Sequence, residues 1–228
     1  MKKLFRTTSI KNNLMMIIML TSAAVTLTNI RAQGNSSDGI EIYSKGNVLL
    51  TSISSNSNSN TGMYVNNSFG TLGNVTLTGT TNGFQYNEYG LVIETNGLVA
   101  LSNAVVSDNR GEGVVVLAYG FGKAVTLTNI TSARNAYEGI FIDAQGPINM
   151  TNCVIKSNGF GYSGSDHYSG VWINGSASYN ITFTGCAVSG NAGNGIYARD
   201  YLNVVLNTTT YYGNVVRHAT GDKNLNIW

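Results

Sequence analysis

The sequence predicts an all-β solenoid in which short parallel strands stack in coils of similar size. Two short patterns alternate along the chain, and both place apolar residues at every second position. A third observation is that one type of amide returns at the same place in nearly every repeat. A fixed chemical pattern with a drifting period indicates regular strands that are joined by turns of variable length.

The first pattern is similar to the letters VTLTN, and its period of two predicts a strand with one buried and one exposed face. We expect the buried side chains of this strand to build a core and to carry no chemistry. They are the pairs Val25/Leu27, Val48/Leu50, Val75/Leu77, Val99/Leu101, Val125/Leu127, Ile148/Met150, Ile181/Phe183 and Val204/Leu206.

The second pattern is a glycine followed by another period-two strand. Its predicted inward pairs are Ile40/Ile42, Met63/Val65, Leu91/Ile93, Val114/Val116, Ile140/Ile142, Val171/Ile173 and Ile196/Ala198.

An amide follows each VTLTN-like start, and in all but one repeat it is asparagine. Side chains at one position of a coil stack lie above one another, so each amide can bind the next and also satisfy the backbone of a bend. We predict an asparagine ladder through Asn35, Asn58, Gln85, Asn109, Asn135, Asn158, Asn191 and Asn214. A second, less complete series is Asn29, Asn103, Asn129 and Asn152.

The alternation of N-x-x-x-G-I-x-I with N-V-T-L-T-N resembles the right-handed parallel β-helix repeat of pectate-lyase-like proteins and many bacterial surface proteins, over residues 25–216. The resemblance implies a single-stranded right-handed parallel β-helix, a solenoid of about eight coils. It also implies three short strands per coil, the third lying near Ile30, Ile53, Ala104, Ile130, Cys153 and Cys186. Such a motif says little about function, because function depends on sites that are grafted onto a fold.

The two ends of the chain differ from the repeats. Residues 1–24 have the order of a secretion signal, in which basic residues precede an apolar run from Leu14 to Leu20 and then small residues. The run is too short to cross a bilayer. We expect an exported protein, extracellular or at the cell surface, without an integral membrane span; the alternative is an N-terminal cap over the first coil. Residues 217–228 are a C-terminal tail or the start of a further coil, which would allow end-to-end continuation.

Composition excludes several classes of partner. Charged residues make up 11% of the chain and the formal charge is +2, without a basic cluster in the repeats, so we expect no nucleic acid partner. Hydrophobic residues make up 43%, which excludes a disordered chain. We expect no cofactor.

The two cysteines occupy the same repeat position in adjacent coils. Their Cα atoms should lie about 5 Å apart, a distance that permits a disulfide. Stacked parallel neighbours orient their Cβ atoms poorly for that bond, however, so we expect Cys153 and Cys186 to be a reduced, buried pair. No histidine or further cysteine joins them, and we expect no metal site.

The outward residues of the glycine-led strands form two columns. The first is Glu41, Tyr64, Val92, Val115, Phe141, Trp172 and Tyr197. The second is Tyr43, Asn66, Glu94, Leu117, Asp143, Asn174 and Arg199. The first column ends in three aromatic residues, and a row of rings on a solvated face is a platform for sugar rings. Asp143, Asn174 and Arg199 would then supply hydrogen bonds. The alternative is that aromatic residues simply pack well on outward strand positions.

The longest turn separates Asn158 from Gly170 and contains Tyr162, Asp166, His167 and Tyr168. An insertion of this kind marks either function or neutral growth of a loop.

A catalytic alternative is a polysaccharide lyase or glycoside hydrolase of pectinase-like architecture that uses Asp143 with Asp166 or His167. Asp143 and Glu94 share a column two coils apart, so their backbones should be about 9.6 Å apart, a separation compatible with an inverting glycosidase. The paired aspartates, the G-H-G turn and the Arg-x-Lys element of polygalacturonases are absent from the sequence.

These observations favour a non-catalytic exported module, a rigid adhesin-like spacer that contacts a polysaccharide or cell-surface glycan through its aromatic residues. A third alternative is a fragment of a larger surface protein with no ligand of its own.

Overall fold

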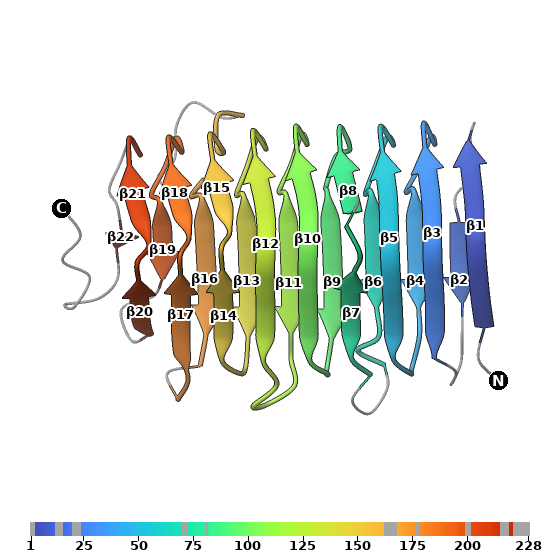
Figure 1. Cartoon of the computed structure of the whole chain (residues 1–228), viewed down its shortest axis with the longest axis horizontal. Helices are drawn as coiled ribbons and strands as arrows, with labels where there is room; N and C mark the ends of the chain where they lie inside the picture. The colour runs from blue at the N-terminus through green and yellow to red at the C-terminus, as the bar shows by residue number, and fades with distance from the viewer. Residues whose placement is uncertain are drawn as a thin grey trace.

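The computed structural model describes residues 3–11, 16–19, 24–69, 73–80, 82–161, 168–176, 178–198, 202–214 and 219–220. Within these residues the chain winds into a stack of parallel strands that runs along its longest axis (Figure 1). Two sheets face each other across the core, a larger one of 13 strands and a smaller one of 9 strands. The predicted all-β solenoid is therefore confirmed.

The larger sheet contains the VTLTN-like strands and the third strand of each coil. Its main path is β1 (Lys3–Lys11), β3 (Val25–Gln33), β5 (Val48–Asn56), β7 (Val75–Thr78), β10 (Val99–Ser107), β12 (Val125–Ala133), β14 (Ile148–Thr151), β17 (Asn180–Thr184) and β20 (Asn203–Asn207). The remaining strands are β8 (Asn82–Gln85), β15 (Val154–Lys156), β18 (Ala187–Ser189) and β21 (Thr210–Tyr212). In four coils of the main path from β3 onward, the VTLTN-like segment and the third strand join into one strand of nine residues.

The smaller sheet contains the glycine-led strands. They are β2 (Met16–Met19), β4 (Ile40–Tyr43), β6 (Met63–Asn66), β9 (Leu91–Thr95), β11 (Val114–Ala118), β13 (Ile140–Ala144), β16 (Val171–Gly175), β19 (Ile196–Ala198) and β22 (Ala219–Thr220). Every neighbouring pair is parallel and in register, so one repeat position forms a straight column across the sheet.

The core is formed by the alternating apolar positions. All predicted inward pairs are buried, with the exception of Leu206, which is only partly buried against the core. Because the period of a strand is two, this result also fixes which side chains face outward.

Two single-residue bends in each coil have left-handed backbone geometry. The first column of such residues is Asn29, Ser52, Gly79, Asn103, Asn129, Asn152, Gly185 and Thr208. It explains the second asparagine series, since asparagine tolerates this geometry better than most residues. The second column is Gly34, Ser57, Tyr86, Asp108, Arg134, Ser157, Gly190 and Gly213. Each of its members directly precedes a residue of the amide ladder.

The amide ladder is continuous and buried. Its members are Asn35, Asn58, Asn87, Asn109, Asn135, Asn158, Asn191 and Asn214. Asn135 is typical: its Nδ2 donates to Asn158 Oδ1 at 3.0 Å and to the Val106 carbonyl at 3.2 Å, and its Oδ1 accepts from Asn109 Nδ2 at 2.8 Å. We call the turn that carries these amides the ladder bend.

The assignment of Gln85 to the ladder is wrong, because Asn87 takes this place. The cause is a turn after Thr78 that is two residues longer than in the next coil. Val75 of β7 pairs with Val99 of β10, whereas Asn82 of β8 pairs with Ala104 of the same strand. Gln85 instead donates from Nε2 to Ser107 Oγ at 2.8 Å.

Both ends of the described chain continue the stack. β1 pairs with β3, β2 pairs with β4, and β22 pairs with β19. The signal peptide and the alternative N-terminal cap stay predictions. The part of the chain that the structure describes contains no helix long and apolar enough to cross a membrane.

Candidate binding face

The outward face of the smaller sheet carries the two predicted columns. The register aligns Glu41, Tyr64, Val92, Val115, Phe141, Trp172 and Tyr197 in one row. It aligns Tyr43, Asn66, Glu94, Leu117, Asp143 and Asn174 in the next. Arg199, the last predicted member of that row, lies outside the described residues.

Three rings lie next to one another at the C-terminal end of the face, and we call Phe141, Trp172 and Tyr197 the aromatic strip. The ring centroids are 6.0 Å apart between Phe141 and Trp172 and 5.2 Å apart between Trp172 and Tyr197. The planes cross at 61° and 71°, so each ring meets its neighbour edge to face. This arrangement places the positive edge of one ring against the negative face of the next. All three side chains remain partly exposed.

The N-terminal end of the same face is a network of hydrogen bonds, which we call the polar cluster: Glu41, Tyr43, Tyr64, Asn66 and Glu94. The Tyr43 hydroxyl donates to Glu41 Oε1 at 2.6 Å, and the Tyr64 hydroxyl donates to Glu94 Oε1 at 3.0 Å. Asn66 Nδ2 lies 3.0 Å from both the Tyr64 hydroxyl and Glu94 Oε2. These hydrogen bonds join the coils of β6 and β9, and an edge-to-face contact between the Tyr43 and Tyr64 rings, with centroids 5.8 Å apart, links the coil of β4 to them.

The polar cluster changes the acidity of its tyrosines. The hydrogen bond to Glu41 raises the pKa of Tyr43 to about 12. Burial raises the pKa of Tyr64 to about 12, and the hydrogen bond to Glu94 adds to the rise. In both cases a nearby carboxylate favours the neutral phenol.

The acids of the catalytic alternative occupy the middle of the face. Glu94 and Asp143 are in register with Leu117 between them, which places them two coils apart as predicted. Both carboxylate oxygens of Glu94 accept hydrogen bonds within the polar cluster. Tyr119 is 50% exposed, and its pKa is raised by burial and then by the charges of Glu94 and Asp143. Asp166, His167 and Tyr162 lie outside the described residues.

The described end of the long loop packs on the preceding coil. The Tyr168 ring stacks on the Tyr137 ring, with centroids 4.7 Å apart and planes at 19°. Each tyrosine lies three residues before a glycine-led strand that carries a ring of the aromatic strip. The sequence contained this signal, since Tyr137 and Tyr168 each stand two residues before the strand's glycine.

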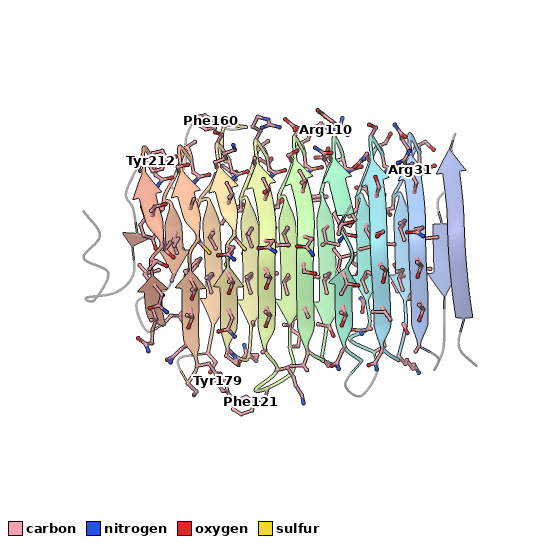
Figure 2. All side chains as sticks on the ribbon, viewed as in Figure 1. Arg31, Arg110, Phe121, Phe160, Tyr179 and Tyr212 are labelled. Carbon is pink, nitrogen blue, oxygen red and sulfur yellow. The ribbon has the colours of Figure 1, made fainter. Side chains whose placement is uncertain are left out.

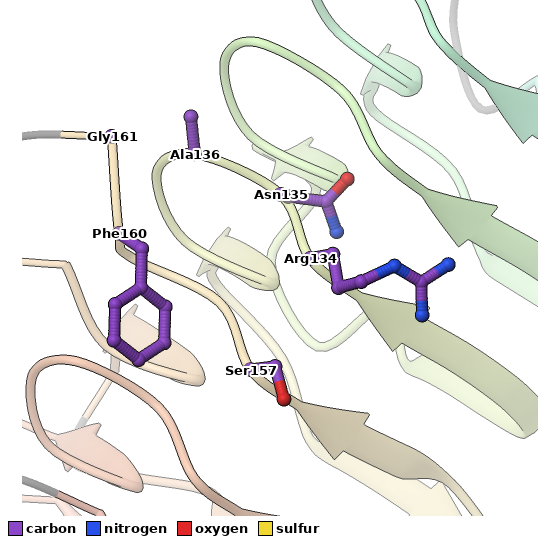
Figure 3. A pocket seen from close by; sticks show the side chains of 6 residues that line it. All are labelled: Arg134, Asn135, Ala136, Ser157, Phe160 and Gly161. Atoms are coloured by element: carbon purple, nitrogen blue, oxygen red, sulfur yellow. The ribbon is translucent and has the colours of Figure 1, made fainter.

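An open pocket of 380 Å³ lies beside the same loop, on the ladder bend (Figure 3). It is lined by Arg134, Asn135, Ala136, Ser157, Phe160 and Gly161. Figure 3 shows the Arg134 side chain pointing away from the Phe160 ring. Arg134 binds both carboxylate oxygens of Asp108, at 2.6 and 2.7 Å, and these hydrogen bonds lower the pKa of Asp108. The positive charge that borders this pocket is thus already paired.

Exposed rings lie on both long edges of the molecule, at positions that follow no repeat of the sequence. Phe160 and Tyr212 lie on the edge of the ladder bend, and Phe121 and Tyr179 lie on the opposite edge (Figure 2). The Phe121 and Tyr179 rings are 5.7 Å apart and meet edge to face.

A buried carboxyl lies just before strand β13 of the smaller sheet. Glu138 is 4% exposed, and burial raises its pKa to about 7. Glu112 precedes the glycine of the neighbouring coil, and burial raises its pKa as well. Aligning the residue before each glycine would have revealed both.

The two cysteines are free thiols, and both are buried. A hydrogen bond to Cys186, together with burial, raises the pKa of the Cys153 thiol well above its usual value. Each Sγ also lies near a carbonyl oxygen of the coil before it, Leu127 for Cys153 and Met150 for Cys186. Among the described residues, no group of three or more histidine, cysteine, aspartate or glutamate side chains could hold a metal ion.

Comparison with known proteins identifies the fold family. Searches of curated proteins and of solved structures each give no significant match. A family model described as "Right handed beta helix region" matches residues 15–178 and 123–222. Together these segments cover most of the chain, in agreement with the parallel stack. The chain belongs to the right-handed β-helix family.

Proposed function

We propose that this protein is an exported, non-catalytic β-helix module that acts as a rigid spacer at the cell surface and contacts polysaccharide through the aromatic strip. The observation that carries the proposal is the position of the strip: three rings stand at one outward position of three successive coils. Rings of this kind bind the apolar faces of sugars while neighbouring polar groups bind their hydroxyls.

The neighbourhood of the strip supports this function. Asp143 and Asn174 are in register in the adjacent column, one coil apart, beside Phe141 and Trp172. A chain of sugars that lies along the solenoid axis would meet rings on one side and polar groups on the other. Export is supported by the order of basic, apolar and small residues in the first 24 positions.

The test is retention of the purified protein on immobilised polysaccharides, followed by substitution of the central ring. Trp172→Ala should weaken binding to a retained polysaccharide by about 1–3 kcal/mol. Tyr86→Ala is the matched control, because Tyr86 is 62% exposed and lies on the ladder bend, away from the strip. If both variants bind like the unmodified protein, or if no polysaccharide is retained, the aromatic strip is not a glycan site.

The catalytic alternative rests on the register of Glu94 and Asp143. A polysaccharide that is retained should be incubated with the protein and assayed for new reducing ends and for unsaturated products. Release that disappears in Asp143→Asn would establish a hydrolase or lyase and would replace the spacer function.

A further inference from the structure

The larger sheet presents a second surface on its outward side, formed by the second and fourth positions of the VTLTN-like strands from β3 to β20. We call it the threonine face. The fourth position carries a hydroxyl in every coil from Thr28 through Thr51, Thr78, Ser102, Thr128 and Thr151 to Thr184. The second position carries threonine in alternate coils, at Thr26, Thr76, Thr126 and Thr182, of which Thr26 is buried and the other three are partly exposed.

The face is therefore periodic in two directions. Neighbouring strands are about 4.8 Å apart across the sheet, and alternate residues are about 6.7 Å apart along a strand. Figure 1 shows these strands lying side by side without fanning out, and Figure 2 shows short side chains repeating from strand to strand. The fourth position thus forms an unbroken row of hydroxyls from β3 to β17, and the second position forms a row in which threonine alternates with Leu49, Ala100, Asn149 and Val205.

The lattice is also rigid. Threonine is branched at Cβ and has few rotamers on a strand. Some hydroxyls are held further: Thr51 Oγ1 and Thr78 Oγ1 are 3.2 Å apart, and Ser102 Oγ donates to the Leu77 carbonyl at 3.0 Å. The backbone below is fixed by the buried core on its other side.

The chemistry of the face restricts its partner. In strands β3 to β20 neither outward column contains a charged or aromatic residue. A dissolved small molecule needs a concave site with converging groups. The described pockets lie on the ladder bend, not on this sheet. A sugar surface would favour aromatic rings, which lie on the opposite sheet.

We propose that the threonine face binds ice. The surface of an ice crystal is a flat, uncharged and periodic array of water molecules, and a flat, uncharged and periodic array of hydroxyls and methyls complements it. Hydroxyls can occupy positions of lattice water, and methyl groups fit between them. Strongly hydrated charges would disrupt the lattice, and the face has none.

The test uses the full chain in solution with a single ice crystal. We expect the protein to shape the crystal and to separate its freezing point from its melting point, and to be incorporated into growing ice. Thr128→Tyr places a protruding ring at the centre of the face and should abolish all three effects. Thr131→Tyr is the matched control, since Thr131 lies on the same strand β12 but beyond the bend at Asn129.

Thermal melts verify that each variant is folded, and Thr151→Tyr replaces Thr128→Tyr if the latter does not fold. Absence of any effect of the unmodified protein on ice overturns the proposal, as does equal activity of Thr128→Tyr and Thr131→Tyr. Retention on a crystalline polysaccharide powder that Thr128→Tyr abolishes, without an effect on ice, would assign the face to a solid glycan instead. Trp172→Ala should leave the ice effect unchanged, which separates this inference from the function of the aromatic strip.

Discussion

The polar cluster and the aromatic strip occupy the same outward face of the same sheet, yet their side chains find their contacts in different ways. In the polar cluster, hydroxyl and amide groups donate hydrogen bonds to carboxylates, within the coil of β4 and between the coils of β6 and β9. In the aromatic strip, rings contact each other by their edges and keep part of their surface exposed. A group whose hydrogen bonds are already made gains little from a ligand, because binding only exchanges one partner for another. The aromatic strip is therefore the better ligand surface.

The polar cluster and the aromatic strip lie over the same hydrophobic core. Comparing them therefore assumes that inward residues determine stability and that outward residues determine binding. Ile140→Asp tests this assumption with the largest expected effect. Ile140 is fully buried, and an unpaired charge there should lower the free energy of unfolding by about 3–5 kcal/mol. Thr126→Asp, at a partly exposed outward position, is the control. Thermal melts in which the two variants lose similar stability would refute the assigned facing of the strands.

The amide ladder is the second element that both ends share. Asn135→Ala removes the donor to Asn158 and the acceptor for Asn109, and it leaves buried groups unsatisfied. We expect a loss of about 1–3 kcal/mol in chemical denaturation. Gln85→Ala should cost less, because Gln85 lies outside the ladder and makes a partly buried bond to Ser107. If Gln85→Ala lowers the free energy of unfolding more than Asn135→Ala does, the assignment of Asn87 rather than Gln85 to the ladder is contradicted.

Alkaline pH should remove the stability that the polar cluster contributes. The aromatic strip takes no part in the hydrogen bonds of that cluster. The folded state raises the pKa of Tyr43 and Tyr64 from 10.0 to about 12. Their contribution to stability is therefore fully present below pH 10 and is lost as the pH rises toward 12, because the unfolded state releases its protons first. Denaturation between these pH values should show a shallower decline for the double variant Tyr43→Phe, Tyr64→Phe. An identical decline would show that the cluster does not hold these phenols neutral.

The smallest expected effect concerns the reactivity of the two buried cysteines in the core. Cys153 and Cys186 should resist a thiol reagent in the native protein and should both react after denaturation without reductant. Trp172→Ala should not accelerate the native reaction, because Trp172 lies on the outside of the opposite sheet. If an unreduced, denatured sample contains no free thiol, the cysteines form a disulfide.

Sequence periodicity was sufficient to predict the fold, the inward residues and those members of the outward columns that the structure describes. The assignment of the ladder depended on a constant number of residues between the start of each VTLTN-like strand and its amide, and it failed in the one coil where this number changes. The displacement of Gln85 by Asn87 is the example, because a longer turn moved the ladder by two positions.

The chemistry of the candidate site was only partly predictable. Periodicity places Tyr64 beside Glu94, but only side-chain geometry shows that both carboxylate oxygens of Glu94 are engaged. The crossing angles of the aromatic rings likewise depend on χ angles, on which the repeat pattern is silent. Asp166, His167 and Arg199, which the sequence also nominated, stay predictions.

The amide ladder also has a mechanical consequence. Its hydrogen bonds point from one coil to the next, along the long axis of the molecule, as the bonds between strands do (Figure 1). A force that pulls the two ends apart would load all interfaces between coils in series, and a terminal coil, which has a neighbour on one side only, would detach before an inner one. Each detached coil would release a length of chain while the remaining coils keep their core, so the protein should yield to stretching in steps rather than by a single rupture.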